Sequence, residues 1–384
     1  MLVHDAVLID GSGRRDRGWV RTSGDTIAEV GIGDGWQAEI ASGDRVVDAA
    51  GAVLTPGFID LHSHGGAGVA FSAEDPAEAL AFHRSHGTTR TLMSLVSAPI
   101  ERQATWLERI AEVAASDPLV LGSHLEGPFL ATHRCGAHDP AVLMSPDPES
   151  VELQLAAAVG TLAMVTIAPE LPGADDAIAR FVDAGGGVAV GHTDADHDTA
   201  RRAFDSGATV LTHAFNAMAP MHHRAPGPVV AAIDAGAALE LILDGVHVHP
   251  SVAAGLFRMA PGRVALITDA ISAAGCADGT YPLGTLTLEV RDGRATLVDS
   301  DTLAGSVLTQ DRALRRAIEV LGIDPVDAVH ALTAVPAAAL GRDDLGWLRA
   351  GCRADLVLLD EQWAPTLVVG DGAVLHDRHG LQER

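Results

Sequence analysis

Residues 56–65 read PGFIDLHSHG, a short apolar run that ends in two histidines. The proline and glycine interrupt the chain before the run, and residues 58–61 have the length and composition of a buried strand. His62 and His64 follow directly where such a strand ends. From Pro56 onward, similar apolar runs alternate with stretches of helical spacing, which is typical of the β/α units of a parallel sheet.

Eight such apolar runs follow one another along the chain. They lie at residues 58–61, 88–96, 120–124, 162–167, 188–190, 209–211, 239–243 and 264–267. Helical spacing with acidic or capping residues near the start lies between several of them, at residues 75–86, 100–115, 175–184 and 196–206. Eight β/α units predict a (β/α)8 TIM-type barrel over residues 56–344, with its active site at the C-terminal ends of the strands.

The two ends of the chain have a different sequence pattern, in which short predicted strands are separated by Gly and Asp turns. The predicted strands lie at residues 2–9, 18–20, 26–30, 46–47, 354–359, 367–369 and 373–375. We expect both ends, residues 1–55 and 345–384, to pair into one small β-sandwich domain. A further hairpin is predicted at residues 285–290 and 295–298, around Asp292-Gly293.

Composition restricts the class of protein. The chain has 384 residues, 47% of them apolar, which is enough to bury the core of a barrel and a small second domain. A formal net charge of −25 argues against nucleic-acid or anionic-membrane partners, which need a basic surface. Three widely spaced cysteines fit no disulfide framework, and no signal or membrane-spanning pattern is visible. We therefore expect a soluble, cytoplasmic protein.

The chain contains no lysine, so all 26 basic residues are arginine. This absence excludes Schiff-base chemistry. It also excludes the carbamylated lysine that bridges two metals in many binuclear hydrolases.

Polar residues gather just past the ends of five of the predicted strands. They are His62, His64, Glu126, His192, His213 and Asp269. Each has a plain alternative on its own: a His-x-His pair arises by chance among 18 histidines, the histidines near 192 and 213 suit a turn or the core, and Asp269 suits a turn cap. Together they predict a site for Zn²⁺ or a similar divalent ion, because these strand ends converge in a barrel.

Six motifs carry a resemblance to a known family. They are PGFIDLHSHG at residues 56–65, HLEGPF at 124–129, GHT at 191–193, THAFNAM at 212–218, DGVH at 244–247 and TDA at 268–270. Through them the chain resembles the N-acetylglucosamine-6-phosphate deacetylases of the amidohydrolase superfamily over nearly its whole length.

The resemblance implies a metal site at Glu126, His192 and His213, with the glutamate in place of the missing lysine. Members that keep both histidines of the His-x-His pair can hold two ions. Because this chain has both, the resemblance favours a second ion at His62 and His64, bridged by Glu126.

The resemblance also implies metal-assisted hydrolysis, in which the cation lowers the pKa of bound water and polarises the acetyl carbonyl. Asp269, placed to touch the metal-bound water, accepts a proton and later delivers it to the sugar amine. His138 contacts the substrate and donates to the developing oxyanion.

The remaining expected contacts involve the sugar and its phosphate. The family's phosphate contacts correspond to Arg224 and His247, and arginine suits phosphate because its planar fork bonds two oxygens. The sugar is expected against Ala137, Asn216, Ala217, Leu303, Ala304 and Gly305. Active sites in the family lie near a dimer interface, so the resemblance implies a homodimer.

Two alternatives stay open. One is an amidohydrolase acting on another acylated amine, such as N-acetylgalactosamine 6-phosphate or an N-acyl amino acid. The phosphate contacts at Arg224 and His247 would disfavour an unphosphorylated substrate, but they do not separate the two epimeric sugars. The other is a non-catalytic barrel that serves as a scaffold, against which the intact ligand set argues.

Overall fold

The computed structural model describes residues 1–40, 45–378 and 380 of the chain. It divides into two compact units. One comprises Met1–Asp60, Ala81–Arg90 and Thr309–Arg384, and the other comprises Leu61–Leu80 and Thr91–Leu308. The domain limits expected from the sequence, after residues 55 and 344, stay a prediction.

The eight predicted barrel strands form one parallel sheet in the order β15-β14-β13-β12-β11-β10-β9-β6. The strands are β6 (Phe58–Asp60), β9 (Thr88–Leu95), β10 (Val120–Glu126), β11 (Leu162–Ile167), β12 (Gly187–Val190), β13 (Val210–Leu211), β14 (Ala238–Ile242) and β15 (Val264–Ile267). Just past the outermost strands, Ser63 and Ala270 form a parallel bridge, so the sheet nearly closes. The predicted TIM-type barrel is confirmed.

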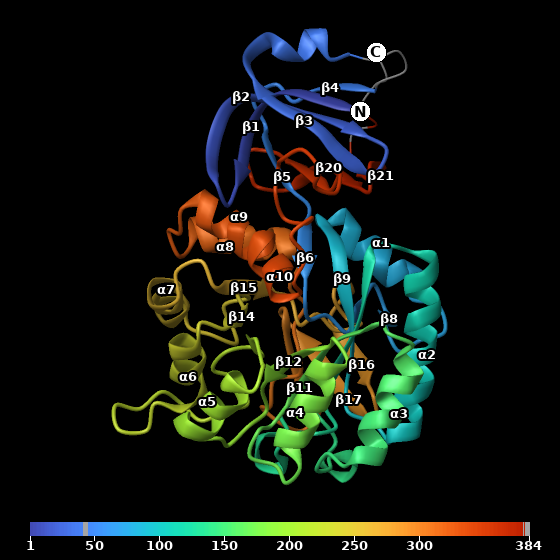
Figure 1. Ribbon diagram of the computed structural model, residues 1–384, viewed down its shortest axis with the longest axis vertical. Helices are drawn as coiled ribbons and strands as arrows, with labels where there is room; N and C mark the ends of the chain where they lie inside the picture. Colours follow the sequence, from blue (N-terminus) through green and yellow to red (C-terminus); the bar gives the residue numbers. More distant parts are fainter. Residues whose placement is uncertain (41–44, 379, 381–384) are drawn as a thin grey trace. The chain divides into compact units, whose positions relative to one another are not determined.

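Helices connect most of these strands and lie on the outside of the parallel sheet (Figure 1). They are α1 (Ala77–Ser85), α2 (Ile100–Ser116), α3 (Pro148–Ala158), α4 (Ala174–Asp183), α5 (His197–Asp205), α6 (Gly227–Ala235) and α7 (Pro250–Met259). Side-chain caps start three of them, because Asp147 accepts from the Ser150 amide, Asp196 from the Thr199 amide and Nδ1 of His249 from the Ser251 amide. Among the described residues, no helix has the length and apolarity needed to cross a bilayer.

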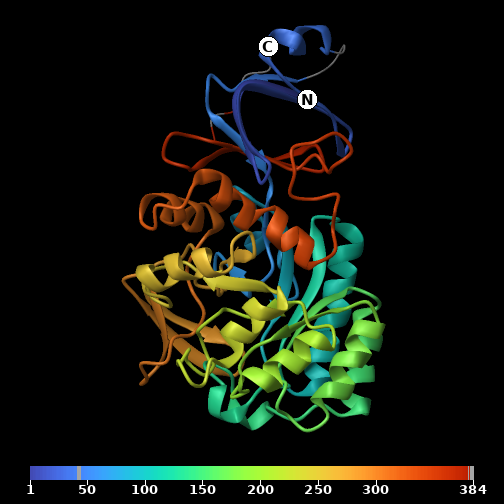
Figure 2. The same cartoon turned by 60° about the vertical axis from the view of Figure 1, so that its left-hand side comes forward.

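Both ends of the chain contribute to a second sheet, in the order β21-β20-β19-β5-β1-β2-β3, with β4 on β1. Its strands are β1 (Leu2–Asp10), β2 (Gly13–Ser23), β3 (Thr26–Ile32), β4 (Val46–Asp48), β5 (Val53–Pro56), β19 (Leu356–Leu359), β20 (Pro365–Gly370) and β21 (Ala373–Asp377). Figure 2 shows the C-terminal strands, in red, beside the N-terminal ones, in blue. The predicted β domain of both termini is confirmed, and its strands form one hydrogen-bonded path because β5 pairs with both β1 and β19.

Three helices belong to the same unit as this sheet, α8 (Gln310–Glu319), α9 (Pro325–Leu332) and α10 (Ala334–Ala339). The core of the sheet includes Leu8, Leu54 and Val369, all of them buried.

The predicted hairpin after the eighth barrel strand is confirmed as β17 (Leu286–Arg291) and β18 (Arg294–Leu297). A third strand, β16 (Gly279–Leu283), pairs with β17 and was not predicted. Pro282 lies inside it, and a proline disfavours a strand in which every amide is needed. The strand tolerates Pro282 because it is at the edge of this small sheet.

Candidate metal centre

The register of the barrel strands brings the predicted ligands together. Val190 of β12 pairs with Leu211 of β13, and each is followed two residues later by a histidine, His192 and His213. Glu126 is the last residue of β10. Because parallel strands end at the same edge, residues far apart in the sequence meet there.

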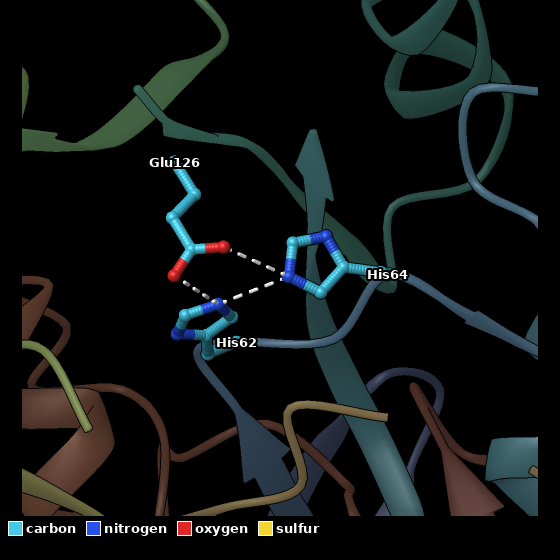
Figure 3. A group of neighbouring side chains, drawn as sticks. All are labelled: His62, His64 and Glu126. Carbon is cyan, nitrogen blue, oxygen red and sulfur yellow. Dashed lines mark hydrogen bonds and ion pairs between the residues drawn. The ribbon is translucent and has the colours of Figure 1, made fainter. Parts of the chain in front are cut away.

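Glu126 lies at the centre of the group and is 3% exposed. Its Oε1 lies 3.0 Å from Nε2 of His192 and 3.1 Å from Nε2 of His213. Its Oε2 lies 3.2 Å from Nε2 of His64, while Nε2 of His62 lies 3.4 Å from Oε1. Figure 3 shows His62 and His64 converging on this carboxylate.

Asp269 lies beside the His-x-His pair. Its Oδ1 is 3.3 Å from Nε2 of His64 and 3.6 Å from Nε2 of His62. Its backbone is held on both sides, since its amide donates to the His62 carbonyl and its carbonyl accepts from the Ser306 amide. Gly305 allows this close approach, because a Cβ there would lie 2.9 Å from the Asp269 carbonyl oxygen.

Three residues of the metal centre have a left-handed backbone that L side chains rarely adopt. The φ angle is 47° at His192, 27° at His213 and 48° at Asp269. Each such residue costs on the order of 1–3 kcal/mol, and such strain is concentrated at functional sites. The strained backbone is therefore a second sign, independent of residue type, that these strand ends are built for a function.

In each histidine, the hydrogen bond made by Nδ1 determines whether Nε2 can bind a cation. Nδ1 of His192 lies 2.8 Å from the Arg134 carbonyl, which can only accept, so Nδ1 carries the proton and Nε2 presents a lone pair. His138 has the opposite arrangement. Its Nδ1 accepts from the Ser97 amide at 3.2 Å, so its Nε2–H points toward Oε2 of Glu126, also at 3.2 Å. His138 is therefore a hydrogen-bond donor facing the site.

The carboxylates and histidines of the centre shift one another's pKa. Burial raises the pKa of Glu126, but His62 and His138 outweigh it and hold that pKa well below its ordinary value. Burial lowers the pKa of His64, but hydrogen bonds to Asp269 and Glu126 outweigh it and raise that pKa to about 9. Burial lowers the pKa of His138, which favours its neutral form. Charged carboxylates thus face the centre at neutral pH.

The donor set fits one or two divalent cations. Two groups share Glu126, one with His62 and His64 and the other with His192 and His213, and the donor atoms within each group lie within 4.8 Å of one another. Imidazole nitrogens with a carboxylate oxygen are the ligands that Zn²⁺ and similar ions prefer.

A cavity of about 240 Å³ opens onto this centre. Of the predicted site residues, its lining includes His64, Glu126, Ala137, His138, His192, His213, Asn216, Ala217, His247, Asp269, Leu303 and Gly305. The lining also includes residues that the sequence did not single out, namely Val96, Gly136, Ile242, Ile271, Leu283 and Thr302. The cavity therefore has an apolar part as well as the polar metal centre.

Three predicted residues do not line the cavity. His62 is fully buried beneath it, and Ala304 is buried in an apolar cluster with Ile271 and Leu288. Arg224 is exposed, and its Nη1 lies 2.6 Å from Nε2 of His223. His247, by contrast, lines the cavity. Its Nδ1 lies 2.7 Å from Oδ2 of Asp244.

Sequence reasoning missed two sets of buried polar residues below the centre. Glu240 of β14 is fully buried, with Oε2 3.2 Å from Nδ1 of His62. Beside the ring of His62, His124 has Nδ1 2.9 Å from Oγ of Ser94 and Nε2 2.8 Å from Oγ1 of Thr166. A charged residue inside an otherwise apolar strand was the available indication for Glu240, whereas a residue such as Thr166 looks ordinary in any strand.

A TIM-type barrel whose strand ends gather imidazole and carboxylate donors around a cavity is the architecture of a metal-dependent barrel enzyme. The chain belongs to the amidohydrolase family, whose model matches residues 53–375. A divalent metal suits both this family and the donor set.

Known proteins resemble the chain over most of its length. The structure of N-acetyl-D-glucosamine-6-phosphate deacetylase from Mycobacterium smegmatis is 41% identical, covers 98% of this chain and all of its own, and has a TM-score of 0.92. A mutant of that enzyme was solved in complex with N-acetyl-D-glucosamine-6-phosphate. N-acetylgalactosamine-6-phosphate deacetylase of Escherichia coli O157:H7 is 39% identical over 80% of this chain and 84% of its own. Human N-acetylglucosamine-6-phosphate deacetylase is 37% identical over 83% and 82%.

Proposed function

We propose that this protein deacetylates N-acetyl-D-glucosamine 6-phosphate, giving D-glucosamine 6-phosphate and acetate. One observation supports this most. The chain matches the Mycobacterium smegmatis deacetylase over nearly all of both chains, and its predicted metal ligands converge beside a single cavity. The cavity carries His138 next to the centre and His247 in its wall.

Glu126, His192 and His213 would hold a divalent ion, which we propose to be Zn²⁺, and this ion would supply Lewis acidity to the acetyl carbonyl and lower the pKa of water. Asp269 is the proton carrier. Its carboxylate lines the cavity and its pKa is low, since His62 and His64 outweigh the effect of burial. It takes a proton from the attacking water and passes it to the amine nitrogen as the amide bond breaks.

His138 stabilises the negative charge that develops on the acetyl oxygen. Its Nδ1 is occupied by the Ser97 amide, so its Nε2–H is the donor available on the cavity side. The lowered pKa favours the neutral ring, in which Nε2–H is the one N–H donor. Donors of this kind contribute about 2.7–4 kcal/mol to transition-state stabilisation.

The phosphate is bound by His247 and Arg224. Burial lowers the pKa of His247, but Asp244 outweighs it and raises that pKa, which favours the imidazolium. The exposed Arg224 lies outside the cavity of its own chain. We therefore propose a homodimer in which Arg224 completes the phosphate contact of the partner subunit. Mass measurement by light scattering tests the dimer directly.

Three further assignments belong to the same proposal. The sugar ring contacts Ala137, Asn216, Ala217, Leu303 and Gly305 in the cavity wall, with Ala304 supporting them from below. His62, His64 and Glu126 would hold a second zinc ion. The protein acts in the cytoplasm, in keeping with three free cysteines.

A second candidate substrate is N-acetylgalactosamine 6-phosphate, because the Escherichia coli relative that acts on it is 39% identical. The two sugars differ only in the configuration at one ring carbon, so both place the acetamide and the phosphate alike. The same metal centre and phosphate contacts therefore serve either substrate.

The test is acetate release from both phosphorylated sugars and from unphosphorylated N-acetylglucosamine. The protein is stripped of metal and then resupplied with zinc. We expect zinc-restored turnover of N-acetylglucosamine 6-phosphate at a higher kcat/KM than of its epimer, with the unphosphorylated sugar turned over poorly. Preference for the epimer would reassign the substrate, and no acetate from any of the three would refute the deacetylase.

A further inference from the structure

Glu240 is a buried carboxyl group that the proposed reaction does not use. It lies in β14 and is fully buried, between Leu239 and Leu241. Burying an ionised carboxylate costs several kcal/mol unless charged or hydrogen-bonding partners compensate it. Its partners therefore indicate why the strand carries a glutamate.

The first partner of Glu240 is a candidate metal ligand. Oε2 of Glu240 lies 3.2 Å from Nδ1 of His62. On the opposite side of the same ring, Nε2 lies 3.2 Å from Nε2 of His64 and 3.4 Å from Oε1 of Glu126. A carboxylate at Nδ1 keeps the proton on that nitrogen, so Nε2 presents its lone pair to the centre.

The second partner of Glu240 belongs to the other group of ligands. The same Oε2 accepts from the backbone amide of His213 at 3.3 Å, and the Glu240 carbonyl accepts from the Ala214 amide at 2.8 Å. His213 has one of the left-handed backbones of the site. Glu240 thus contacts the side chain of His62 in one ligand group and the backbone of His213 in the other.

The other ligand histidines have no such partner. Nδ1 of His192 faces a neutral carbonyl, and Nδ1 of both His64 and His213 has no hydrogen-bond partner within the described part of the chain. His62 alone has a carboxylate behind it. A carboxylate behind a ligand imidazole makes the ring a stronger donor, and removing such a partner weakens metal binding about 10–100-fold.

We propose that Glu240 is the positioning residue of the second cation. It orients His62, keeps the Nδ1–H tautomer and strengthens Nε2 as a donor, so that His62, His64 and Glu126 hold a divalent ion beside the one at Glu126, His192 and His213. This inference rests on the proposed metal-dependent function. It states that the centre binds two ions when Glu240 is present and one ion when it is absent.

The experiment measures zinc binding to the full chain, without reference to turnover. Metal-free wild type, Glu240→Gln and Glu240→Leu are titrated with zinc against a competing chelator, and zinc per chain is counted by mass spectrometry after dialysis. Cobalt is titrated in parallel, because its visible absorption reports the ligands of each equivalent. His62→Ala is the reference for loss of the second ion. Gln154→Leu, at a buried amide that donates to Gln103, is the matched control for a buried polar loss.

We expect two ions in the wild type and in Gln154→Leu. In Glu240→Gln the second ion should bind about 10-fold more weakly, because the amide oxygen still accepts from Nδ1 but carries no charge. In Glu240→Leu, as in His62→Ala, the second ion should be lost or bind at least about 100-fold more weakly. The first ion should lose much less affinity, because the backbone bond from the Ala214 amide to the Glu240 carbonyl remains beside His213. Glu240→Gln keeps the test valid if Glu240→Leu does not fold.

Three results would overturn the inference. They are a single ion in the wild type, unchanged affinity of the second ion in both Glu240 variants, or equal loss of both ions, which would indicate a purely structural role. Failure of the proposed function is a separate result, namely wild-type protein that binds zinc and releases no acetate.

Discussion

Replacing Asp269 with Asn tests the proton transfer directly. The amide has the same shape as the carboxyl group, and the backbone at this position is held by the His62 carbonyl and the Ser306 amide, so the new side chain should occupy the same place. What is lost is the ability to accept a proton. A positioned general acid–base contributes about 10²–10⁴-fold, which corresponds to about 3–5 kcal/mol of the activation barrier.

The assay is acetate release at saturating substrate, with zinc content measured on the same sample. We expect kcat to fall by about 10²–10⁴-fold with little change in KM. The ion at Glu126, His192 and His213 should stay, since Asp269 is outside that group. Asp311→Asn, at a partly buried carboxyl paired with His86, is the control and should keep its kcat. A variant that keeps its zinc and loses less than about tenfold in kcat would refute the general-base role.

Three further predictions concern the phosphate contact and the fold. Arg224→Ala should raise KM for the phosphorylated sugar and leave kcat nearly unchanged, because the phosphate is remote from the bond that breaks; steady-state kinetics with an unchanged KM would place the phosphate elsewhere. Because Asp244 raises the pKa of His247, KM for this sugar should stay low below that pKa and rise as pH increases through it. Asp244→Asn should move this rise in KM to lower pH. A KM independent of pH in both proteins would argue against an imidazolium contact. Arg90→Met leaves the carboxylates of Asp355 and Asp371 without their buried guanidinium and should lower the free energy of unfolding by about 3–5 kcal/mol in a urea titration, whereas a loss below about 1 kcal/mol would mean that the pair is compensated by water.

The barrel and the position of its ligands were predictable because most barrel strands are short, largely apolar runs, and polar residues stand at or just past the ends of five of them. Strands buried on both faces have this composition. The position of the ligands follows from the rule that barrel sites lie at the C-terminal ends of the strands. β16 was not predictable, because Pro282 counts against a strand unless its edge position is known. Nor was the placement of Arg224, since a local motif does not say whether a loop faces its own cavity.

Glu240 shows why the supporting residues escape a reading of the sequence. Its partners His62 and His213 lie 178 and 27 residues away, so its neighbours in the chain say nothing about them. The left-handed backbones of His192, His213 and Asp269 escape for the same reason. Their φ angles depend on contacts across the barrel, whereas a sequence indicates such angles most clearly where it has glycine.

Charge balance links the missing lysine to Glu240. Without lysine the centre has no carbamate bridge, and Glu126 supplies the single negative charge between the two ligand groups. Two divalent ions bring four positive charges into a buried site, where uncompensated charge is costly. Glu126 and Asp269 offset only two of these charges, and Glu240, fully buried behind His62, supplies a third. The centre is therefore closest to electrically balanced with two cations when all three carboxylates are present. Removal of Glu240 should shift the balance toward a single ion even where His62 keeps its orientation.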